Sequence, residues 1–456
     1  MKSNFANNKF GCVCEQVVHT SDDINIGGIS GLFNKTCQFS PGLQKSNKIE
    51  FIQPLNTSVG NREARIDKRI ELLEMFLPVE FINEHADRLS VREERCRKLT
   101  TAETVQFSVA QALLGTGLRT TMPAIMLGAG LQNPELGEHF LDHKAYIYRK
   151  KKVGYKFLEE LLKALPKPTI SGDANPSAWY KDFHIRIFDG MKRDVFASEK
   201  NWKYFGSMRQ DASYPQLLTV AAIDGGEHLP LGIKYAPVKK GSKGEPSLAN
   251  EILVELPQFN EPTLWLGDRN FSSYRLFDEI SRRGEDFCMR ASRSWKFGNV
   301  IEKLPDDSFL FLAKDWRKIG KRKKEPMMLR GIKYAVIKID EETGKEVREE
   351  YYLITSLLDH EKYPACELID LYPKRWEVEI AFDEVLNGIF RGEEMLRSKT
   401  PETVLFESYS LWIAYYVIRM LIIQSKELAA TDKGNGENKT EKLTQSNSGK
   451  NKKNQN

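Results

Sequence analysis

Two aspartates in the sequence come at the ends of apolar runs that we predict to be strands. Asp189 follows FHIRIF, and Asp268 follows PTLWLG. A sheet positions such a side chain firmly while leaving its carboxylate exposed at the strand's end. Carboxylate oxygens favour Mg²⁺ or Mn²⁺ over zinc. The pair therefore predicts a metal site, although either aspartate alone would also fit a turn or a helix cap.

A third carboxylate could come from residues 372–388, YPKRWEVEIAFDEVLNG, which we predict to be helical. A helix packed across the strand ends would bring a carboxylate to the two aspartates. Two carboxylate-bound Mg²⁺ ions roughly 3.5–4 Å apart can activate an attacking oxygen and stabilise a leaving one. The residues alone leave four candidates open, namely Glu377, Glu379, Asp383 and Glu384.

The elements that would position these residues are predicted from position 183 onward. Apolar runs rich in β-branched and aromatic residues predict strands, and apolar residues at helical spacing predict helices. The predicted strands are 183–190, 216–224, 230–238, 262–271 and 285–292, and the predicted helices are 245–256 and 272–284, the second capped by Ser272. This β-β-β-α-β-α-β order indicates an α/β domain with a mixed sheet.

The segment 295–358 breaks this pattern and is predicted to form a β insertion subdomain between a first core segment (180–294) and the closing helices of the core (359–430). Its basic run RKIGKRKK could contact DNA phosphates or could be an ordinary solvated loop. Phosphate contacts would give affinity and salt dependence rather than sequence choice. The DNA-contact candidates in this run are Lys321, Arg322, Lys323 and Lys324.

The N-terminal part is predicted to hold a loosely ordered segment (1–64) and a helical DNA-binding domain (65–165). Thr100 or Thr101 can cap one of its helices. The basic runs 91–98 and 148–156 flank these helices, as in DNA-binding modules, and solvated surface charge is an equally good reading of each. At the other end, 431–456 has almost no apolar residues and is predicted to be a disordered tail.

The overall composition indicates a globular protein, with 41% hydrophobic and 29% charged residues among 456. A net charge of +5 is too small to prove a nucleic-acid partner. The six cysteines include no CxxC pair, so free thiols in a reducing cytosol are expected. His139 and His143 have helical spacing but lack the glutamate of a HExxH zinc motif, so no metal is expected there.

Neither membrane insertion nor export is expected. The polar N-terminus MKSNFANNKFGC is unlike a signal peptide. The apolar stretch 404–424 is long enough to span a bilayer, but Glu407 and Arg419 interrupt it. We therefore predict that it is a buried core helix.

Four sequence blocks, in order, resemble the DDE transposases of bacterial insertion sequences, in the insertion-sequence-4 group. They are FDGMKRDVFASEKNWKYFG, LWLGDRNF, YPKRWEVEIAFDEV and LRSKTPE, at 188–206, 264–271, 372–385 and 396–402. The third is similar to the group's Y-(2)-R-(3)-E-(6)-K signature. The resemblance implies a ribonuclease-H-like mixed-sheet catalytic core with a β-strand insertion and a helical N-terminal region. The 111 positions between Asp268 and Glu379 leave room for the insertion.

The resemblance also implies roles for individual residues. Glu379 becomes the third metal ligand beside Asp189 and Asp268, with two Mg²⁺ or Mn²⁺ ions as cofactors. Tyr372 and Arg375 become DNA phosphate contacts, whereas without the resemblance a core tyrosine and a surface salt bridge would be expected.

Other residues of the signature stretch receive ordinary structural roles. Trp376 is predicted to lie in the core. Glu377, Asp383 and Glu384 are predicted to be solvated or structural. Pro373 is expected to start a new helical segment and to place Tyr372 in a helix cap.

The activity implied by the resemblance is cut-and-paste DNA transposition. Water would attack the phosphodiester at the element's end, and the freed 3′-OH would attack the opposite strand to form a hairpin, or later the target DNA. The implied partners are double-stranded DNA, as terminal inverted repeats and target, and a second copy of the chain in a synaptic dimer. The implied location is the bacterial cytoplasm, at the nucleoid when bound to DNA.

Three departures from the family pattern leave alternatives open. Leu386 stands at the signature lysine position, and Lys399 and Arg391 are the candidate substitutes for the lysine. Asn270 replaces the usual glycine after the second aspartate, and Phe196-Ala197 replaces the Pro-Asp that often follows the first. One alternative is therefore a degenerate, catalytically weak copy that acts only as a DNA-binding protein. Another is a general Mg²⁺ nuclease that does not depend on terminal repeats.

Overall fold

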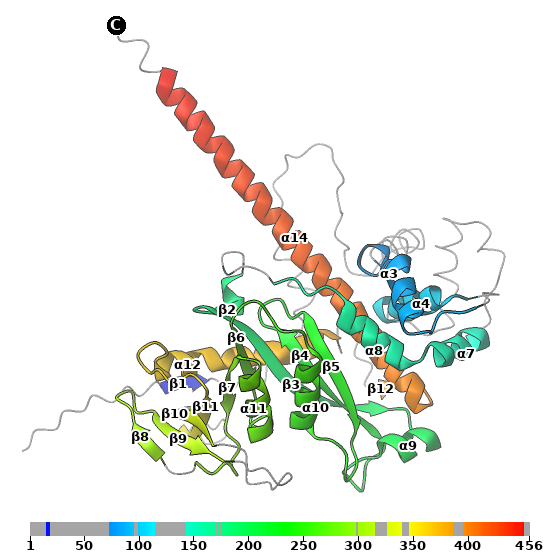
Figure 1. Ribbon diagram of the computed structural model, residues 1–456, viewed down its shortest axis with the longest axis horizontal. Coiled ribbons are helices and arrows are strands. Elements are labelled where there is room, and N and C mark those ends of the chain that lie inside the picture. Colours follow the sequence, from blue (N-terminus) through cyan, green and yellow to red (C-terminus); the bar gives the residue numbers. More distant parts are fainter. Residues whose placement is uncertain are drawn as a thin grey trace, which may run out of the picture.

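The structure is a computed structural model, and one long mixed sheet runs through it, with helices on both faces (Figure 1). Along its main path the strand order is β5-β4-β3-β6-β7-β11-β10-β9-β8. The residues that the structure describes are 15–18, 73–94, 99–114, 143–169, 172, 175–297, 300–314, 326–339, 346–385 and 395–450.

Five strands at one end of this sheet have the topology of a ribonuclease-H-like core. The first three in the chain form an antiparallel meander, and the next two run parallel to the first, on its other side. This order confirms the predicted fold class. The strands are β3 (Phe183–Val195), β4 (Gln216–Asp224), β5 (Pro230–Pro237), β6 (Thr263–Gly267) and β7 (Asp286–Arg290).

Helices cover both faces of the core sheet, so its central strands are nearly continuous apolar runs rather than alternating ones. Helices α10 (Glu245–Glu255) and α11 (Tyr274–Arg282) cover one face. The other face packs against α8 (Tyr155–Ala164), α13 (Glu377–Asp383) and α14 (Pro401–Lys450). The N-cap of α11 is Ser273, whose hydroxyl accepts from the Leu276 N–H at 3.4 Å, one residue after the predicted Ser272.

The insertion continues the core sheet instead of forming a sheet of its own. Strand β11 (Glu346–Thr355) pairs antiparallel with β7, and β10 (Met327–Ile339), β9 (Phe309–Ala313) and β8 (Val300–Lys303) follow outward. The predicted β character of 295–358 is confirmed in its described parts. Strand β1 (Glu15–Val18) pairs parallel with β10, so this stretch of the segment predicted to be loosely ordered forms part of the sheet.

The described part of 65–165 is helical, as predicted. Its helices are α3 (Val79–Arg88), α4 (Thr101–Leu114), α7 (His143–Val153) and α8 (Tyr155–Ala164). Thr100 is the cap of α4: its hydroxyl accepts from the Glu103 N–H at 3.1 Å, and its own N–H donates to the Glu103 carboxylate at 2.7 Å. Helices α4 and α8 pack on α14, which joins this region to the core.

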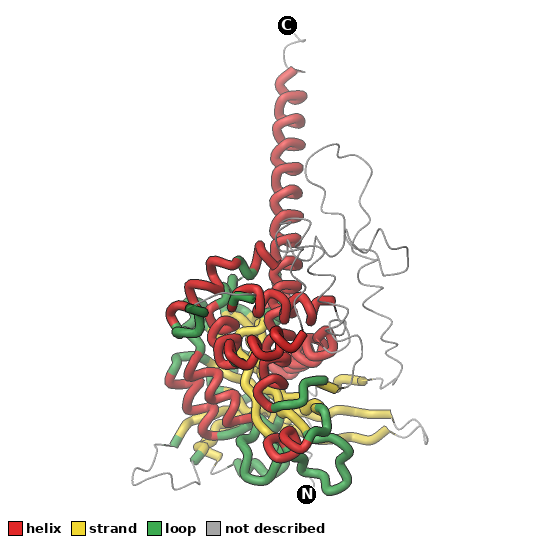
Figure 2. Tube along the Cα trace, turned by 90° about the vertical axis from the view of Figure 1, so that its right-hand side faces the viewer, coloured by secondary structure: helices red, strands yellow, loops and turns green. Residues whose placement is uncertain are grey.

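Helix α14 (Pro401–Lys450) begins inside the molecule and extends well beyond it (Figures 1 and 2). Among the described residues, its part Pro401–Lys426 has the length and apolarity of a membrane span, but 78% of the apolar window is buried, which confirms the predicted core helix. The prediction of disorder from 431 differs from the structure, in which the helix continues to Lys450. No proline follows Pro401, so no residue of that stretch lacks the N–H that the helix needs.

Candidate active site

Asp189 lies within β3 and not at its end, contrary to the prediction. The strand continues to Val195 because β4 still pairs with it, and Asp189 itself is opposite Ala221. The parallel neighbour β6 does stop here, since the last paired residues are Phe188 and Gly267. Asp268 follows Gly267 directly. The two aspartates are therefore neighbours in register at the end of β6, which is the edge that the sequence predicted.

The turn after β6 fixes the second aspartate. The Asn270 N–H donates to Oδ1 of Asp268 at 2.7 Å, and the Phe271 N–H donates to its carbonyl at 3.1 Å. These bonds tie the Asp268 side chain and backbone to the first turn that leaves the sheet.

Glu379 comes to the two aspartates on a helical segment that crosses β3. The segment consists of α12 (Ala365–Leu371), the 3₁₀ turn η2 (Tyr372–Trp376) and α13 (Glu377–Asp383), and α13 packs against β3. Tyr372 is the C-cap residue of α12 and Pro373 lies at the start of η2, as predicted. Of the four candidate carboxylates, the structure thus brings Glu379 to the end of β6.

Arg375 links the strand residue Asp189 to the helix residue Glu379. Its Nη1 lies 3.0 Å from Oε1 of Glu379 and 3.3 Å from Oδ2 of Asp189. The Tyr372 hydroxyl donates to the Gly267 carbonyl at 3.4 Å, next to Asp268. The signature residues Tyr372, Arg375 and Glu379 therefore all face the strand ends.

The carboxylates are close enough to disturb one another. Burial raises the pKa of Asp189 to about 7, and the charges of Asp268 and Glu379 act in the same direction, against the Gly190 N–H and Arg375. A site in which an aspartate resists ionisation at neutral pH is one where a cation would relieve the repulsion.

The donor set fits a hard divalent cation, because it consists of carboxylate oxygens. Within the described ranges, no three His, Cys, Asp or Glu side chains are already gathered closely enough to hold a metal ion. The Arg375 guanidinium provides the positive charge between Asp189 and Glu379 instead.

The predicted DNA-contact residues have different surroundings. Tyr372 and Arg375 are both buried, each about 8% exposed. Lys321, Arg322, Lys323 and Lys324 lie outside the described residues, as does Leu386. Within the basic run 148–156, Arg149 forms an ion pair with Glu93 and Lys150 is buried, so neither is an ordinary solvated charge.

The neighbours of Glu379 on its helix have the roles predicted for them, except Trp376. Asp383 is exposed, while Glu377 and Glu384 make structural contacts. Trp376 was expected in the core, but it is 56% exposed. The reason is that the 3₁₀ turn directs Arg375 inward, and the next residue then points outward, with its ring 4.7 Å from the Arg375 guanidinium carbon.

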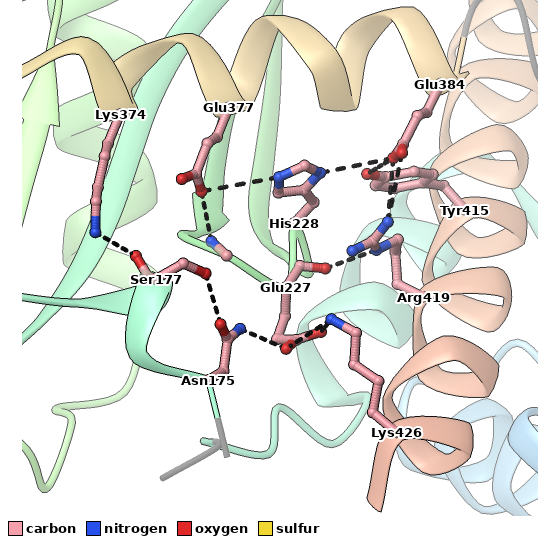
Figure 3. A network of polar contacts seen from close by, with 11 residues as sticks. Asn175, Ser177, Glu227, His228, Lys374, Glu377, Glu384, Tyr415, Arg419 and Lys426 are labelled. Atoms are coloured by element: carbon pink, nitrogen blue, oxygen red, sulfur yellow. Dashed lines mark hydrogen bonds and ion pairs between the residues drawn. The ribbon is translucent and has the colours of Figure 1, made fainter. Parts of the chain in front are cut away.

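A polar network fixes α13 against the turn between β4 and β5 (Figure 3). The Gly226 N–H donates to Glu377 at 2.5 Å, and the His228 ring lies 3.8 Å from Glu377 and 3.7 Å from Glu384. Glu384 also accepts from the Tyr415 hydroxyl of α14 at 2.7 Å. Two carboxylates that flank Glu379 thus anchor its helix.

The β4–β5 turn is also held by α14 and by the segment before β2 (Trp179–Tyr180) (Figure 3). Arg419 donates to the Glu227 carbonyl at 2.6 Å, and Lys426 lies 3.0 Å from the Glu227 carboxylate. The Asn175 amide donates to that carboxylate at 2.5 Å. Sequence reasoning missed Glu227 and His228, because no short motif marks a turn that contacts helices more than 140 residues away.

Glu245, at the start of α10, is another residue that sequence reasoning missed. Its side chain lies against Gly190, the residue after Asp189. An acidic residue in the first turn of a helix is ordinary, since it complements the helix dipole, and so its position gave no signal.

Comparisons with known sequences identify the family of this region of the chain. Residues 181–417 match the sequence profile of the family described as "Transposase DDE domain". The chain is also 29% identical over 217 residues to the transposase InsG of insertion sequence element IS4 from Escherichia coli (strain K12). That alignment covers 47% of this chain and 46% of InsG, so the chain spans less than half the length of that relative.

Among solved structures, the cryo-EM structure of the piggyBac transposase synaptic complex with hairpin DNA is similar at a TM-score of 0.39 and 11% identity. That match covers 78% of this chain and 76% of the other, and a likeness this low supports no conclusion. The family match is different in kind, because it spans more than half of the 456 residues and includes Asp189, Asp268 and Glu379. On this match, the chain belongs to the transposase DDE domain family.

Proposed function

We propose that this protein is an insertion-sequence transposase that cleaves DNA at the ends of its element and transfers the strands to a target. The proposal is supported by the position of Asp189 and Asp268 side by side at the end of β6, with Glu379 linked to Asp189 through Arg375. The similarity to the IS4 transposase supports the same class of element.

In this proposal Asp189, Asp268 and Glu379 are the residues that would hold two Mg²⁺ or Mn²⁺ ions, and such ions would supply activation of an attacking oxygen and stabilisation of a leaving one. The sheet positions Asp189, the turn after β6 positions Asp268, and the anchored α13 positions Glu379. Arg375 balances their charge in the metal-free protein, and its planar guanidinium can grip a DNA phosphate bidentately. Tyr372 orients the backbone of Gly267 beside Asp268.

The partners in this proposal are DNA and a second copy of the chain. DNA enters as terminal inverted repeats and as target, with Tyr372, Arg375 and the run Lys321–Lys324 contacting its phosphates. Two chains pair in the synaptic complex. The protein acts in the bacterial cytoplasm, at the nucleoid when bound to DNA.

The test is Mg²⁺-dependent cleavage of a DNA fragment that carries the element's own ends, with Glu379→Ala compared to Asp383→Ala. Both carboxylates lie on α13, one helical turn apart, but Asp383 is exposed whereas Glu379 is half-buried and paired with Arg375. Glu379→Ala should abolish cleavage and leave binding intact, and Asp383→Ala should cleave normally. Normal cleavage by Glu379→Ala would remove that residue from the site.

The products separate the proposal from its two rivals. A hairpin at the cut end supports the two-step route. Binding without cleavage by the unmutated chain supports the degenerate copy, and Leu386→Lys is then the variant that should restore cleavage. Cleavage that ignores the terminal repeats supports a general nuclease.

A further inference from the structure

Helix α9 (Glu199–Phe205) and the two segments beside it form an exposed surface beyond the end of β3. The helix packs against β5 and α14, where β12 (Met395–Leu396) and α14 begin (Figure 1). Phe205 is buried in the same core as Val378 of α13. Helix α9 therefore lies on the face of the sheet that α13 covers.

Hydrogen bonds join α9 to the segment before α14. The Asn201 amide donates to the Ser398 carbonyl at 2.9 Å, and the Ser198 hydroxyl donates to the Lys399 carbonyl at 2.7 Å. Ser198 is also the N-cap residue of α9, since its hydroxyl accepts from the Asn201 N–H at 3.1 Å. The backbone of residues 398 and 399 is thus held against the start of the helix.

The exposed side chains here are lysines and aromatic rings. Trp202 and Tyr204 are 37% and 42% exposed on α9. Lys239, which follows β5, donates to the Lys203 carbonyl at 3.1 Å, and its ammonium lies 5.9 Å from the centre of the Tyr204 ring. We define the α9 surface as six exposed residues, namely Lys200, Lys203, Lys239, Lys399, Trp202 and Tyr204.

The positive charge of the α9 surface is not neutralised by the parts of the chain that the structure describes. None of its four lysines forms an ion pair with a described acidic residue. Lys243, in the same loop as Lys239, does form one, with Glu251 at 2.6 Å. The acidic residue of α9, Glu199, is in the first turn, where it complements the helix dipole. A surface with this charge attracts an anionic partner.

The lysines also indicate which class of partner fits. Aromatic side chains are enriched in protein–protein interfaces, but lysine is depleted there. Lysines clustered on one face are instead the usual feature of a surface that binds nucleic acid. The indole N–H of Trp202 and the hydroxyl of Tyr204 are further hydrogen-bond donors that a phosphate can accept from.

The α9 surface is separate from the candidate site. Residues 189–194 are extended, because β3 pairs with β4 up to Asp194. At about 3.3 Å per residue, Phe196 is roughly 20 Å from Asp189. The Lys399 ammonium lies 5.1 Å from the centre of the Phe196 ring. Lys399 is therefore too far from Asp189 to contact a phosphate held there, and its charge belongs to the α9 surface.

We propose that the α9 surface binds the phosphate backbone of duplex DNA. The proposal rests on the proposed function in one respect, namely that the partner is the DNA that the candidate site cuts. It adds a contact away from the cut bond. The residues that make this contact lie outside both the helical region 65–165 and the run Lys321–Lys324.

The test is DNA binding by the full chain, measured by fluorescence anisotropy at several salt concentrations. One duplex carries the element's own end, and the other is an unrelated sequence of the same length. The double variant Lys200→Gln, Lys203→Gln removes two charges from α9. The control double variant Lys243→Gln, Arg282→Gln also removes two charges, but these pair with Glu251 and Glu279.

The α9 double variant should bind both duplexes about tenfold or more weakly than the wild type at low salt. The slope of log affinity against log salt should become shallower by about 1.8, since each phosphate contact contributes about 0.9. The control should bind within about twofold of the wild type, with the same slope. Melting curves of both variants show that they are folded.

The other outcomes overturn the proposal in distinguishable ways. If the wild type binds the element's end and the α9 double variant binds it as the control does, this proposal falls and the proposed function stands. If the wild type binds neither duplex, the proposed function falls as well. A loss confined to one duplex contradicts phosphate contacts, which carry no sequence information. A change in sedimentation with unchanged DNA binding would assign the surface to contacts with a second copy of the chain instead.

Discussion

At the scale of single residues, Arg375 determines the charge balance of the candidate site. Its guanidinium contacts Asp189 and Glu379 and is 8% exposed. Removing one partner of a largely buried ion pair leaves the other charges uncompensated. The free energy of unfolding then falls by more than the intact pair contributes to it. The residue therefore matters for the metal-free protein, apart from the DNA contact proposed for it.

Arg375→Gln should lower the stability of the metal-free protein by roughly 1–3 kcal/mol, the cost of leaving partly buried charged groups without their partner. Added Mn²⁺ should restore more of the melting temperature in this variant than in the wild type. Arg92→Gln is the matched control, since the Arg92–Asp87 pair is about half exposed and should contribute under about 1 kcal/mol. Equal losses in the two variants would contradict this account.

Asp189 should make the stability of the metal-free protein depend on pH. Its folded pKa of about 7 lies above the ordinary value of 3.8, so the folded chain binds this proton more tightly than the unfolded chain. The contribution to stability is complete at low pH and is lost as the pH rises through 7. Asp189→Asn should therefore raise the melting temperature at pH 8 more than at pH 5, in buffer with EDTA. The same difference at both pH values would contradict the prediction.

At the scale of elements, the β4–β5 turn determines where α13 lies. Glu377→Ala removes the acceptor of the Gly226 N–H and the neighbour of His228, and should cost about 1–3 kcal/mol because that N–H loses its partner. Cleavage should fall as well, since the helix that carries Glu379 loses an anchor. Asp383→Ala, on the exposed side of the same helix, should change neither the melting temperature nor cleavage.

The strands and helices of the core could largely be predicted from the sequence, because each has a strong local pattern. QLLTVAAID and EPSLANEILVEL coincide with β4 and α10 to within a residue. The extent of β3 could not be predicted, since Gly190 and Asp194 are unfavourable in strands. They are kept extended by pairing with β4, and Asp194 also pairs with Met395, about 200 residues away in the sequence. Local patterns also cannot show which surface a side chain meets, so the exposure of Trp376 and the site contacts of Glu245 needed the three-dimensional structure.

At the scale of the whole molecule, the packing of α14 divides that helix into two parts. The described side chains from Pro401 to Lys426 are mostly buried, and Arg419 and Lys426 contact the β4–β5 turn. A chain that stops after residue 430 keeps all of these contacts. It should melt within about 2 °C of the full chain and cleave DNA normally, whereas a chain that stops after 418 should not fold, because the two cations that contact Glu227 are lost. A large loss of stability in the chain that stops after residue 430 would contradict this division of the helix.

The continuity of the sheet has a mechanical consequence. Strands β8 to β11 are joined edge to edge with β7, and β7 with β6, whose last residue precedes Asp268. Among the described strands of this path, ladder hydrogen bonds connect the insertion directly to the core. If the protein binds DNA as proposed, a load on the outer strands would be transmitted through the ladder to the residue before Asp268, so binding far from the candidate site could change the geometry of the site.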